Sequence, residues 1–304
     1  MVFLGLDGGG STVRLGAYAD DMTEIGRVTH SNSVNPSTIG RDLAAERIHA
    51  AIRELLENTG LATDAIESIG VGISGADTGH SRDWLLQTLG VVLPGVAVTA
   101  SGDYEIALVA AHGERYGILL LSGTGSVAYG VNHAGRGHRV GGWGYYIGDE
   151  GSGYWLGMMA LRHLAHVADG RAAPSLLSEQ ARLAIGINQT IDELIGWVYH
   201  SGKPRNQDMA KLAGLVLECA ENGDTFAQGL VTQAADDLYA HYTAVVNVLE
   251  LDDAPIGFAG GLLSSVNLLS RGLMQRLDLT QLPQAKYEPV AGAALLAKIS
   301  QEQE

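Results

Sequence analysis

The chain of 304 residues contains one cysteine, Cys219, and only 7 prolines. A single cysteine excludes an intrachain disulfide and any zinc or iron–sulfur site built from several cysteines of one chain. Cys219 stands in a helical pattern, where we interpret it as a small core residue. The scarcity of proline and the lack of a Gly-X-Y period exclude collagen-like sequences and proline-rich linkers.

Positive charge is also scarce. Lys and Arg number 19 against 34 Asp and Glu, so the formal net charge is −15 and the isoelectric point is about 5.0. Nucleic acids and anionic membrane surfaces both attract Lys and Arg patches, so this balance argues against either as a partner. A phosphate ligand stays open, because backbone N–H groups bind phosphates without side-chain charge.

Long hydrophobic runs are missing as well. No apolar stretch approaches the roughly 18 residues of a transmembrane helix, and the N-terminus lacks the basic and apolar regions of a signal peptide. Hydrophobic residues nevertheless make up 46% of the chain, and the mean hydropathy is +0.09. This composition is globular rather than disordered. We therefore expect a globular, cytoplasmic protein.

The abundant residue is glycine, with 41 copies, about twice its average usage. Two turns of similar composition each follow an apolar strand pattern: residues 7–12 (DGGGST) and residues 122–126 (SGTGS). Glycines let the backbone approach a bulky anion, hydroxyls add donors, and an Asp at a strand end can hold hydrated Mg²⁺. The pair of turns, one in each half of the chain, predicts a polyphosphate bound from both sides.

Two other nucleotide motifs are disfavoured. The Walker loop needs G-x-x-x-x-G-K-[ST] before a helix, and no such run occurs. The run from Gly123 through Gly125 to Ala128 matches a loose dinucleotide fingerprint. That fingerprint must open a helix. Residues 127–131 alternate like a strand instead, which argues against a dinucleotide site.

The order of patterns predicts an α/β fold that passes twice through strand, glycine turn and strand, which suggests an internal duplication. The expected strands are 2–7, 13–19, 25–30, 68–73, 96–100, 117–122, 127–131, 256–259 and 284–287. The expected helices are 37–59, 81–90, 104–112, 153–168, 175–185, 190–200, 206–222, 224–250, 262–276 and 290–300. Residues 132–137 carry a strong turn signal.

Further polar residues stand where strands end. Asp103 follows strand 96–100, which places it in the ligand crevice of an α/β sheet or makes it a helix N-cap. The segment 141–152 combines glycines, Trp143, Asp149 and Glu150. An aromatic face beside carboxylates is typical of a sugar-binding wall, although Asp149 could equally cap the next helix. Asn35 and Ser74 are, by themselves, ordinary turn residues.

These motifs together resemble the N-acetylglucosamine kinases. The chain carries, in the order seen there, LGLDGGGST, GISGAD, SGD, LSGTGSV, GGWGYYIGDEGSGYWLG, FAGGLL and EPVAGAALLA. These kinases belong to the superfamily of actin, sugar kinases and heat-shock ATPases, in a branch shared with dehydratase-activator ATPases. The resemblance implies an actin-like ATPase fold of two ribonuclease H-like lobes with a central cleft. The lobes would be residues 1–115, completed by 289–304, and residues 116–288.

The resemblance also implies roles for individual residues in an ATP- and Mg²⁺-dependent sugar kinase that could form a homodimer. Asp7 would organise Mg²⁺, and Asp103 would be the general base that accepts the proton of the sugar 6-hydroxyl. ATP would bind to Gly9, Gly10, Ser11, Thr12, Thr124, Gly125, Gly260 and Gly261. The sugar would bind to Asn35, Ser74, Asp103, Gly142, Trp143 and Asp149.

The chain departs from that family at two points. Arg14 stands at a shifted position relative to the basic residue that commonly follows the first turn, and Val127 stands where an Asn commonly touches the sugar. Glucosamine or several hexoses therefore remain alternatives to N-acetylglucosamine as the acceptor. A sugar-sensing binding protein or a non-sugar ATPase remains an alternative from another class. The lone Cys219 argues against a dehydratase activator, whose cluster needs bridging cysteines.

Overall fold

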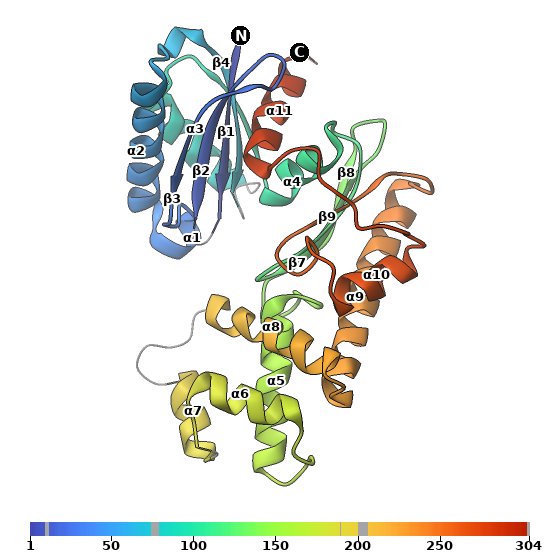
Figure 1. Ribbon diagram of the computed structural model, residues 1–304. Helices are drawn as coiled ribbons and strands as arrows, with labels where there is room; N and C mark the ends of the chain where they lie inside the picture. Colours follow the sequence, from blue (N-terminus) through green and yellow to red (C-terminus); the bar gives the residue numbers. More distant parts are fainter. Residues whose placement is uncertain (10–11, 74–78, 189, 200–205, 303–304) are drawn as a thin grey trace.

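The computed structural model describes residues 1–9, 12–73, 79–188, 190–199 and 206–302 (Figure 1). Three of the predicted site residues, Gly10, Ser11 and Ser74, lie outside these ranges. The chain folds into two separate sheets with helices around each, so it is a mixed α/β protein.

The first sheet places three strand ends at one edge. Its order is β3-β2-β1-β4-β5, from β1 (Val2–Gly8), β2 (Val13–Ala19), β3 (Glu24–His30), β4 (Ile66–Ile73) and β5 (Ala97–Ser101). Strands β1, β4 and β5 run parallel, whereas β2 and β3 pair as antiparallel neighbours. The register pairs Asp7 with Gly72 and Gly72 with Ser101. The residues that follow these three strands therefore meet at the same edge.

Helices cover both faces of this sheet. One face buries Leu4, Leu6 and Ile69 against α2 (Arg41–Thr59) and α3 (Gly79–Val92). The short elements α1 (Pro36–Ile39) and a 3₁₀ turn (Thr63–Ala65) flank α2. The C-terminal helix α11 (Pro289–Glu302) lies on the other face beside α4 (Asp103–His112), although the two are far apart in sequence (Figure 1).

Two glycines allow α11 to pack closely against the first sheet. A Cβ atom on Gly5 of β1 would stand 1.9 Å from the carbonyl oxygen of Val290, and one on Gly70 of β4 would stand 1.8 Å from that of Ala293. No side chain fits at such distances, because the backbone of the helix itself occupies the space. Glycine at these positions therefore lets the last helix lie directly on the two central strands.

The second sheet repeats the arrangement of the first. Its order is β8-β7-β6-β9, from β6 (Gly117–Ser122), β7 (Ser126–Val131), β8 (Gly137–Gly141) and β9 (Ile256–Ala259). As in β3-β2-β1-β4, an antiparallel meander is followed by a parallel partner on the other side of its first strand. Helix α4 packs on one face, where Leu119 meets Ile106. Helix α9 (Thr225–Leu249) packs on the opposite face, where Ile118 and Leu120 lie with Val245.

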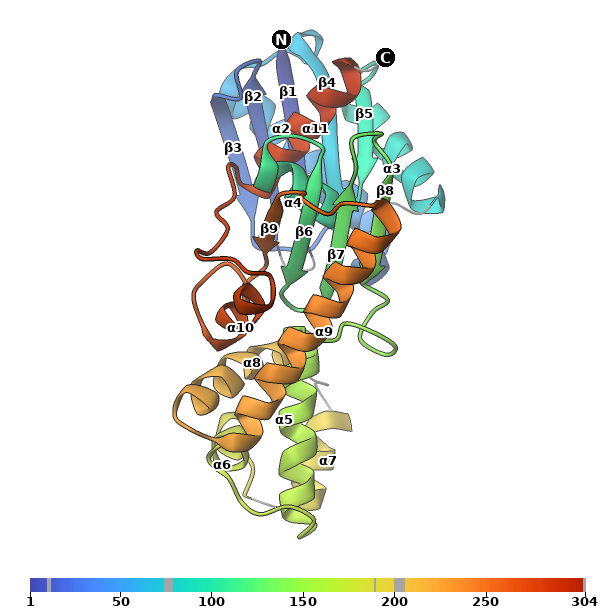
Figure 2. The ribbon, with the colours of Figure 1, turned by 90° about the vertical axis from the view of Figure 1, so that its right-hand side faces the viewer.

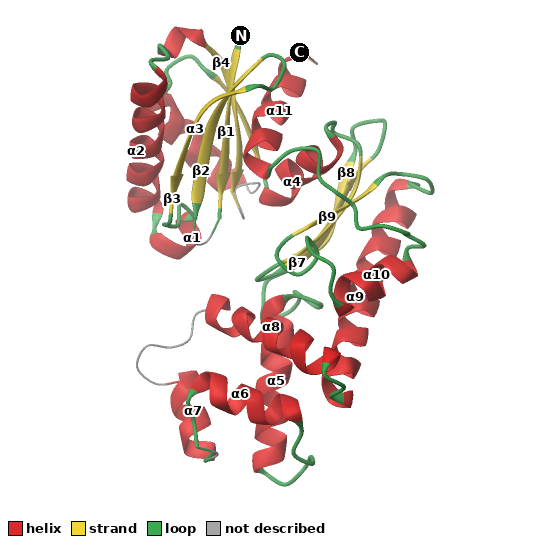
Figure 3. Ribbon diagram, in the orientation of Figure 1, coloured by secondary structure: helices red, strands yellow, loops and turns green. Residues whose placement is uncertain are grey.

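Four helices extend away from the second sheet (Figures 2 and 3). They are α5 (Gly153–Ala168), α6 (Leu176–Ile185), α7 (Ile191–Tyr199) and α8 (Asn206–Glu221). Helix α10 (Leu268–Arg276) packs beside α9. A separate apolar cluster that includes Leu161, Ile185 and Met209 holds α5, α6 and α8 together. Throughout the described ranges, no helix combines the length and apolar character that crossing a membrane requires.

Four elements differ from the sequence-based expectation. The helix predicted over 37–59 is divided into α1 and α2 at Gly40, whose φ of 85° breaks the helical path. The helix predicted from residue 262 begins only after Asn267, whose side chain accepts the N–H groups of Leu269 and Ser270. Strand β8 was not predicted, and no strand forms at residues 284–287.

Candidate active site

Asp7 supplies the acidic group at the first glycine turn. Because β1 and β2 pair Asp7 with Arg14, its carboxylate accepts a hydrogen bond from Arg14 Nη1 at 3.0 Å. The Asp7 side chain is only 13% exposed. Burial raises the pKa of the Asp7 carboxyl above its ordinary value, against the opposing effect of the Arg14 guanidinium. The charged carboxylate is thus held in an environment that a nearby cation would stabilise.

The first turn is tied to the segment that carries Asn35. The Gly9 N–H donates to the carbonyl of Thr12 at 2.9 Å, which closes the turn. Ser33 Oγ donates to the Gly9 carbonyl at 3.4 Å and accepts the Asn35 N–H at 3.1 Å. Arg47 Nη1 donates to the Ser33 carbonyl at 2.7 Å. Neither Ser33 nor Arg47 was predicted from the sequence, since no motif marks them.

Asp103 opens α4 directly after β5, as predicted. The backbone N–H of Tyr104 donates to Asp103 Oδ1 at 3.1 Å, while Gly102 takes the N-cap position. Asp103 therefore sits within the first turn of the helix rather than capping it. Asp7 lies near the end of β1 and Asp103 follows β5, and β4 stands between these strands, so about two strand spacings, roughly 10 Å, separate β1 from β5. A transferring phosphoryl group and its acceptor can be placed in that interval.

The second sheet brings Thr124, Gly125, Gly260 and Gly261 together, although β6 and β9 are far apart in sequence. Leu262 donates its N–H to the Ser122 carbonyl at 3.1 Å. Gly260 has a φ of 83°, and a Cβ atom there would stand 2.3 Å from the same carbonyl oxygen. The turn after β6 and the turn after β9 therefore lie in direct contact.

The segment after β8 is fastened onto the second glycine turn. Gly153 and Tyr154 donate backbone N–H groups to the carbonyls of Gly123 and Thr124, at 2.8 Å and 3.1 Å. Ser122 Oγ donates to the Gly151 carbonyl at 2.8 Å, and Ser126 Oγ donates to that of Glu150 at 2.7 Å. Reciprocal bonds of this kind fix the distance between the turn and the residues around position 150.

Asp149 lies in the same segment, next to the residues that bond to the second glycine turn. It is 8% exposed and has a φ of 60°. Its carboxylate faces Gly125, where a Cβ atom would stand 2.9 Å from Asp149 Oδ2. Burial raises the pKa of Asp149, whereas the backbone N–H groups of Ser126 and Gly144 lower it. The helix-cap alternative for Asp149 is wrong, because the Ser152 side chain caps α5 by accepting the Trp155 N–H.

Arg139 of β8 connects the two halves of the predicted sugar site. Its guanidinium carbon lies 5.6 Å from the ring centre of Trp143 and 5.7 Å from that of Tyr104, the neighbour of Asp103. The sequence analysis did not single out Arg139. The sequence did offer one indication of Arg139: it is a basic residue three positions before Gly142, in a chain that has few basic residues.

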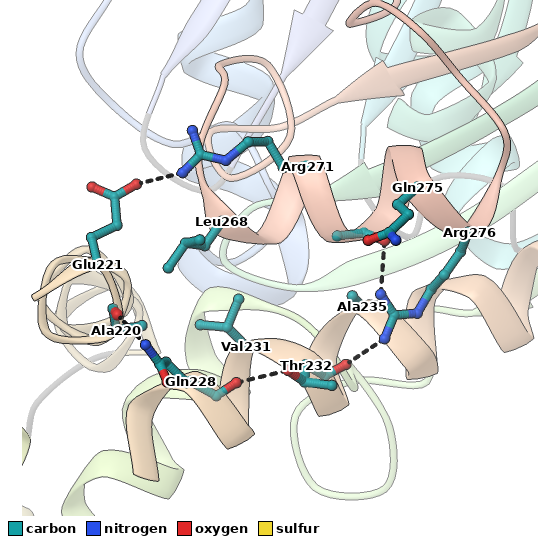
Figure 4. A pocket seen from close by; sticks show the side chains of 11 residues that line it. Ala220, Glu221, Gln228, Val231, Thr232, Ala235, Leu268, Arg271, Gln275 and Arg276 are labelled. Carbon is teal, nitrogen blue, oxygen red and sulfur yellow. Dashed lines mark hydrogen bonds and ion pairs between the residues drawn. The ribbon is translucent and has the colours of Figure 1, made fainter. Parts of the chain in front are cut away.

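A cavity elsewhere contains none of the predicted residues. It measures about 810 Å³ and lies between α8, α9 and α10 (Figure 4). Both of its arginines are already paired, Arg271 with Glu221 at 3.0 Å and Arg276 with Asp236 at 2.6 Å. Its place on the helices, away from both glycine turns, separates it from the candidate active site.

The described residues contain no group of three His, Cys, Asp or Glu side chains that could hold a metal ion by themselves. Mg²⁺ that binds together with a nucleotide needs fewer ligands from the protein, because one or two carboxylates, the phosphates and water complete its octahedral coordination. The single buried carboxylate of Asp7 at the phosphate turn suits that kind of binding.

The fold and these turns define an ATPase of the actin-like class, and the comparison of sequences agrees. Residues 4–297 match the BadF/BadG/BcrA/BcrD ATPase family, to which the chain belongs. The chain is 29% identical to an N-acetylmuramic acid/N-acetylglucosamine kinase of Clostridium acetobutylicum, over 97% of each chain. It is also 29% identical to an N-acetyl-D-glucosamine kinase of Dictyostelium discoideum, again over 97% of each.

A solved structure shows the same fold. A Chromobacterium violaceum protein assigned to the N-acetylglucosamine kinases superposes with a TM-score of 0.78, at 28% identity, over 97% of this chain and 98% of its own. The predicted two-lobed α/β fold is thereby confirmed. With these relatives, the chain is a phosphotransferase that acts on an alcohol acceptor.

Proposed function

We propose that this enzyme transfers the terminal phosphoryl group of ATP to the 6-hydroxyl of N-acetylglucosamine, with Asp103 as general base. The observation that supports the proposal is the placement of Asp7 at the end of β1 and of Asp103 just after β5, two parallel strands that end at the same edge of one sheet. The acceptor class is supported by the names of the two kinases at 29% identity.

Phosphoryl transfer depends mainly on positioning and on charge neutralisation. We assign the phosphates of ATP to the turn of Gly9, Gly10, Ser11 and Thr12 and to the facing turn of Thr124 and Gly125. Gly260 and Gly261 would border the adenosine. Mg²⁺ would supply positive charge between the phosphate oxygens, held through water by the buried carboxylate of Asp7. Backbone N–H groups supply the remaining positive potential, so few basic side chains are needed.

Asp103 performs the proton transfer in this proposal. Its carboxylate accepts the proton of the 6-hydroxyl as that oxygen attacks the terminal phosphorus, and ADP leaves on the opposite side. The sugar would be held by Asn35, Ser74, Gly142, Trp143 and Asp149. The exposed Trp143 ring, at 65%, offers an apolar face to the C–H surface of a sugar.

The sugar would lie between lobes that we assign to residues 1–115 with 289–304 and to residues 116–288. Closure of the two over the acceptor would exclude water, which otherwise competes for the phosphoryl group. The packing of α11 on β1 and β4 is consistent with placing the last helix in the N-terminal lobe.

The test is ADP release from Mg·ATP with a panel of N-acetylglucosamine, glucosamine and glucose, together with calorimetric titration of each sugar. We expect release that depends on N-acetylglucosamine. Asp103→Asn should lower kcat by at least about 100-fold and leave sugar affinity within a few-fold. Asp64→Asn, the same change at an exposed position, is the control.

Three outcomes would contradict the proposal. ADP release without any sugar would indicate an ATPase that serves another partner. Sugar binding without turnover would indicate a sensing protein. Turnover retained by Asp103→Asn would remove Asp103 from the role of base.

A further inference from the structure

Tyr129 joins the second sheet to the helix that carries Asp103. It lies on β7, between Leu119 of β6 and Arg139 of β8 in the register of the sheet, and it is buried. Its ring faces α4, where it belongs to the same apolar cluster as Ile106 and Leu119. Helix α4 begins at Asp103, so this contact is made with the first turn of the helix that carries the proposed base.

The two residues that follow Asp103 both lie against this one side chain. The ring centres of Tyr104 and Tyr129 are 4.7 Å apart and the rings are tilted by 50°, which is the geometry of a favourable aromatic pair. The Tyr129 hydroxyl is within hydrogen-bonding reach of the Glu105 carboxylate. Burial and the charge of Glu105 raise the pKa of Tyr129, against the opposing charge of Arg115. The hydroxyl therefore stays protonated and serves as a donor.

Glu105 is held in turn by the loop between β7 and β8. Arg115 donates from Nε to Glu105 Oε1 at 2.8 Å, and from Nη1 to the carbonyl of Gly135 at 2.9 Å. Because the Glu105 side chain is only 15% exposed, solvent screens this ion pair less than it would an exposed one. The first turn of α4 is therefore fastened to the second sheet by the ring of Tyr129 and by this ion pair.

The other end of β7 meets the second glycine turn. The strand begins at Ser126, directly after Thr124 and Gly125, which we assign to the phosphates of ATP. Hydrogen bonds to β6 on one side and to β8 on the other fix the strand in the sheet. A short, paired stretch of strand and one side chain thus connect the proposed phosphate turn with the proposed base.

We propose that Tyr129 is a positioning residue that holds Asp103 at a fixed distance from the second glycine turn. It acts through the ring of Tyr104 and needs no contact with either substrate. The inference rests on the proposed function, since the base and the phosphate turn are those of that site. A misplacement of about 1 Å can cost on the order of 100-fold in rate. Loss of the Tyr129 ring should therefore slow the transfer step and leave substrate binding intact.

The experiment measures kcat and the KM values for N-acetylglucosamine and Mg·ATP. Tyr129→Leu removes the ring contact with Tyr104, so we expect kcat to fall by about tenfold or more while both KM values stay within a few-fold. Tyr129→Phe keeps the ring and should retain kcat within a few-fold. Tyr242→Leu is the matched control, because Tyr242 is half-buried against the core on the opposite face of the second sheet. It should behave like the wild type.

A double-mutant cycle separates positioning from a general loss of structure. If Tyr129 acts through the base, Tyr129→Leu should not lower any further the residual turnover of Asp103→Asn. Melting curves show whether each variant is folded, and Tyr129→Met, whose flexible side chain fills an irregular gap, replaces Tyr129→Leu if that variant is not.

Three results overturn the proposal: an unchanged kcat in Tyr129→Leu, a loss that falls on KM alone, or the same fold loss of turnover with and without Asp103→Asn. Failure of the proposed function looks different. N-acetylglucosamine would then not stimulate ADP release by the wild type, or Asp103→Asn would keep full turnover.

Discussion

Asp7 shows how a single residue can be placed for function at the expense of the fold. Its carboxylate is buried at the end of β1, and burial raises its pKa although Arg14 donates to it at 3.0 Å. A carboxyl whose pKa is raised by folding destabilises the folded state whenever it is ionised. A cation bound at the turn would offset the free energy lost in this way, which fits the proposed role of Asp7 in holding Mg²⁺.

Asp7→Asn should therefore separate activity from stability. We expect ATP-dependent turnover to fall by at least about 100-fold, while the melting temperature at pH 7 stays equal to that of the wild type or rises. Because the folded-state pKa of Asp7 is raised, the protonated carboxyl favours folding. The melting temperature of the wild type should thus rise relative to that of the variant as the pH falls toward the ordinary carboxyl range, about 4.

Melting curves of both proteins between pH 7 and pH 4 provide the measurement. A variant that is clearly less stable at pH 7 would mean that the contact with Arg14 outweighs the burial of Asp7. A variant that keeps full turnover would remove Asp7 from the metal site.

At the scale of elements, the seat of α11 on β1 and β4 is the contact that joins the two ends of the chain. A Cβ atom on Gly5 would stand 1.9 Å from the carbonyl oxygen of Val290, which is closer than any Cβ atom tolerates. Phe3, Tyr18, Ala291 and Ala294 complete the buried contact around it. Any side chain at position 5 must lift the helix from the strand.

Gly5→Ala should accordingly destabilise the protein by at least about 3 kcal/mol, since overpacking against backbone cannot be relieved by a side-chain rotation. Urea unfolding followed by circular dichroism gives the free energy. The control is Gly90→Ala in α3, where nothing lies within 4 Å of the added carbon and helix propensity favours alanine by about 1 kcal/mol. Equal stabilities of the two variants would show that α11 is not held in this way.

How much of the candidate site could be predicted from the sequence depends on how clearly the strands that carry it are marked. The positions of Asp7, Thr124 and Asp103 at the ends of β1, β6 and β5 could be predicted, because clearly apolar runs mark these strands, whereas their roles stay predictions. Arg139 was missed because β8 carries two glycines and a histidine among its five residues, so no alternation marked it as a strand. The contact of Gly260 with Ser122 was beyond prediction, since it arises from the parallel pairing of β6 and β9.

For the whole molecule, the formal net charge of −15 appears unfavourable for binding ATP, which is itself an anion. Backbone N–H groups and Mg²⁺ can supply positive potential without Lys or Arg, and each sheet has a glycine turn after its first strand. The acidity of the surface and the binding of a polyphosphate are therefore compatible.

The central claim is that the enzyme transfers the terminal phosphoryl group of ATP to the 6-hydroxyl of an N-acylated amino sugar. The most direct measurement is phosphorus–proton correlation NMR of the product formed from N-acetylglucosamine and Mg·ATP. We predict one sugar phosphate whose phosphorus couples to the protons on carbon 6, and none when Asp103→Asn replaces the wild type. Phosphate attached at another carbon, or ATP consumed to inorganic phosphate alone, would contradict the account.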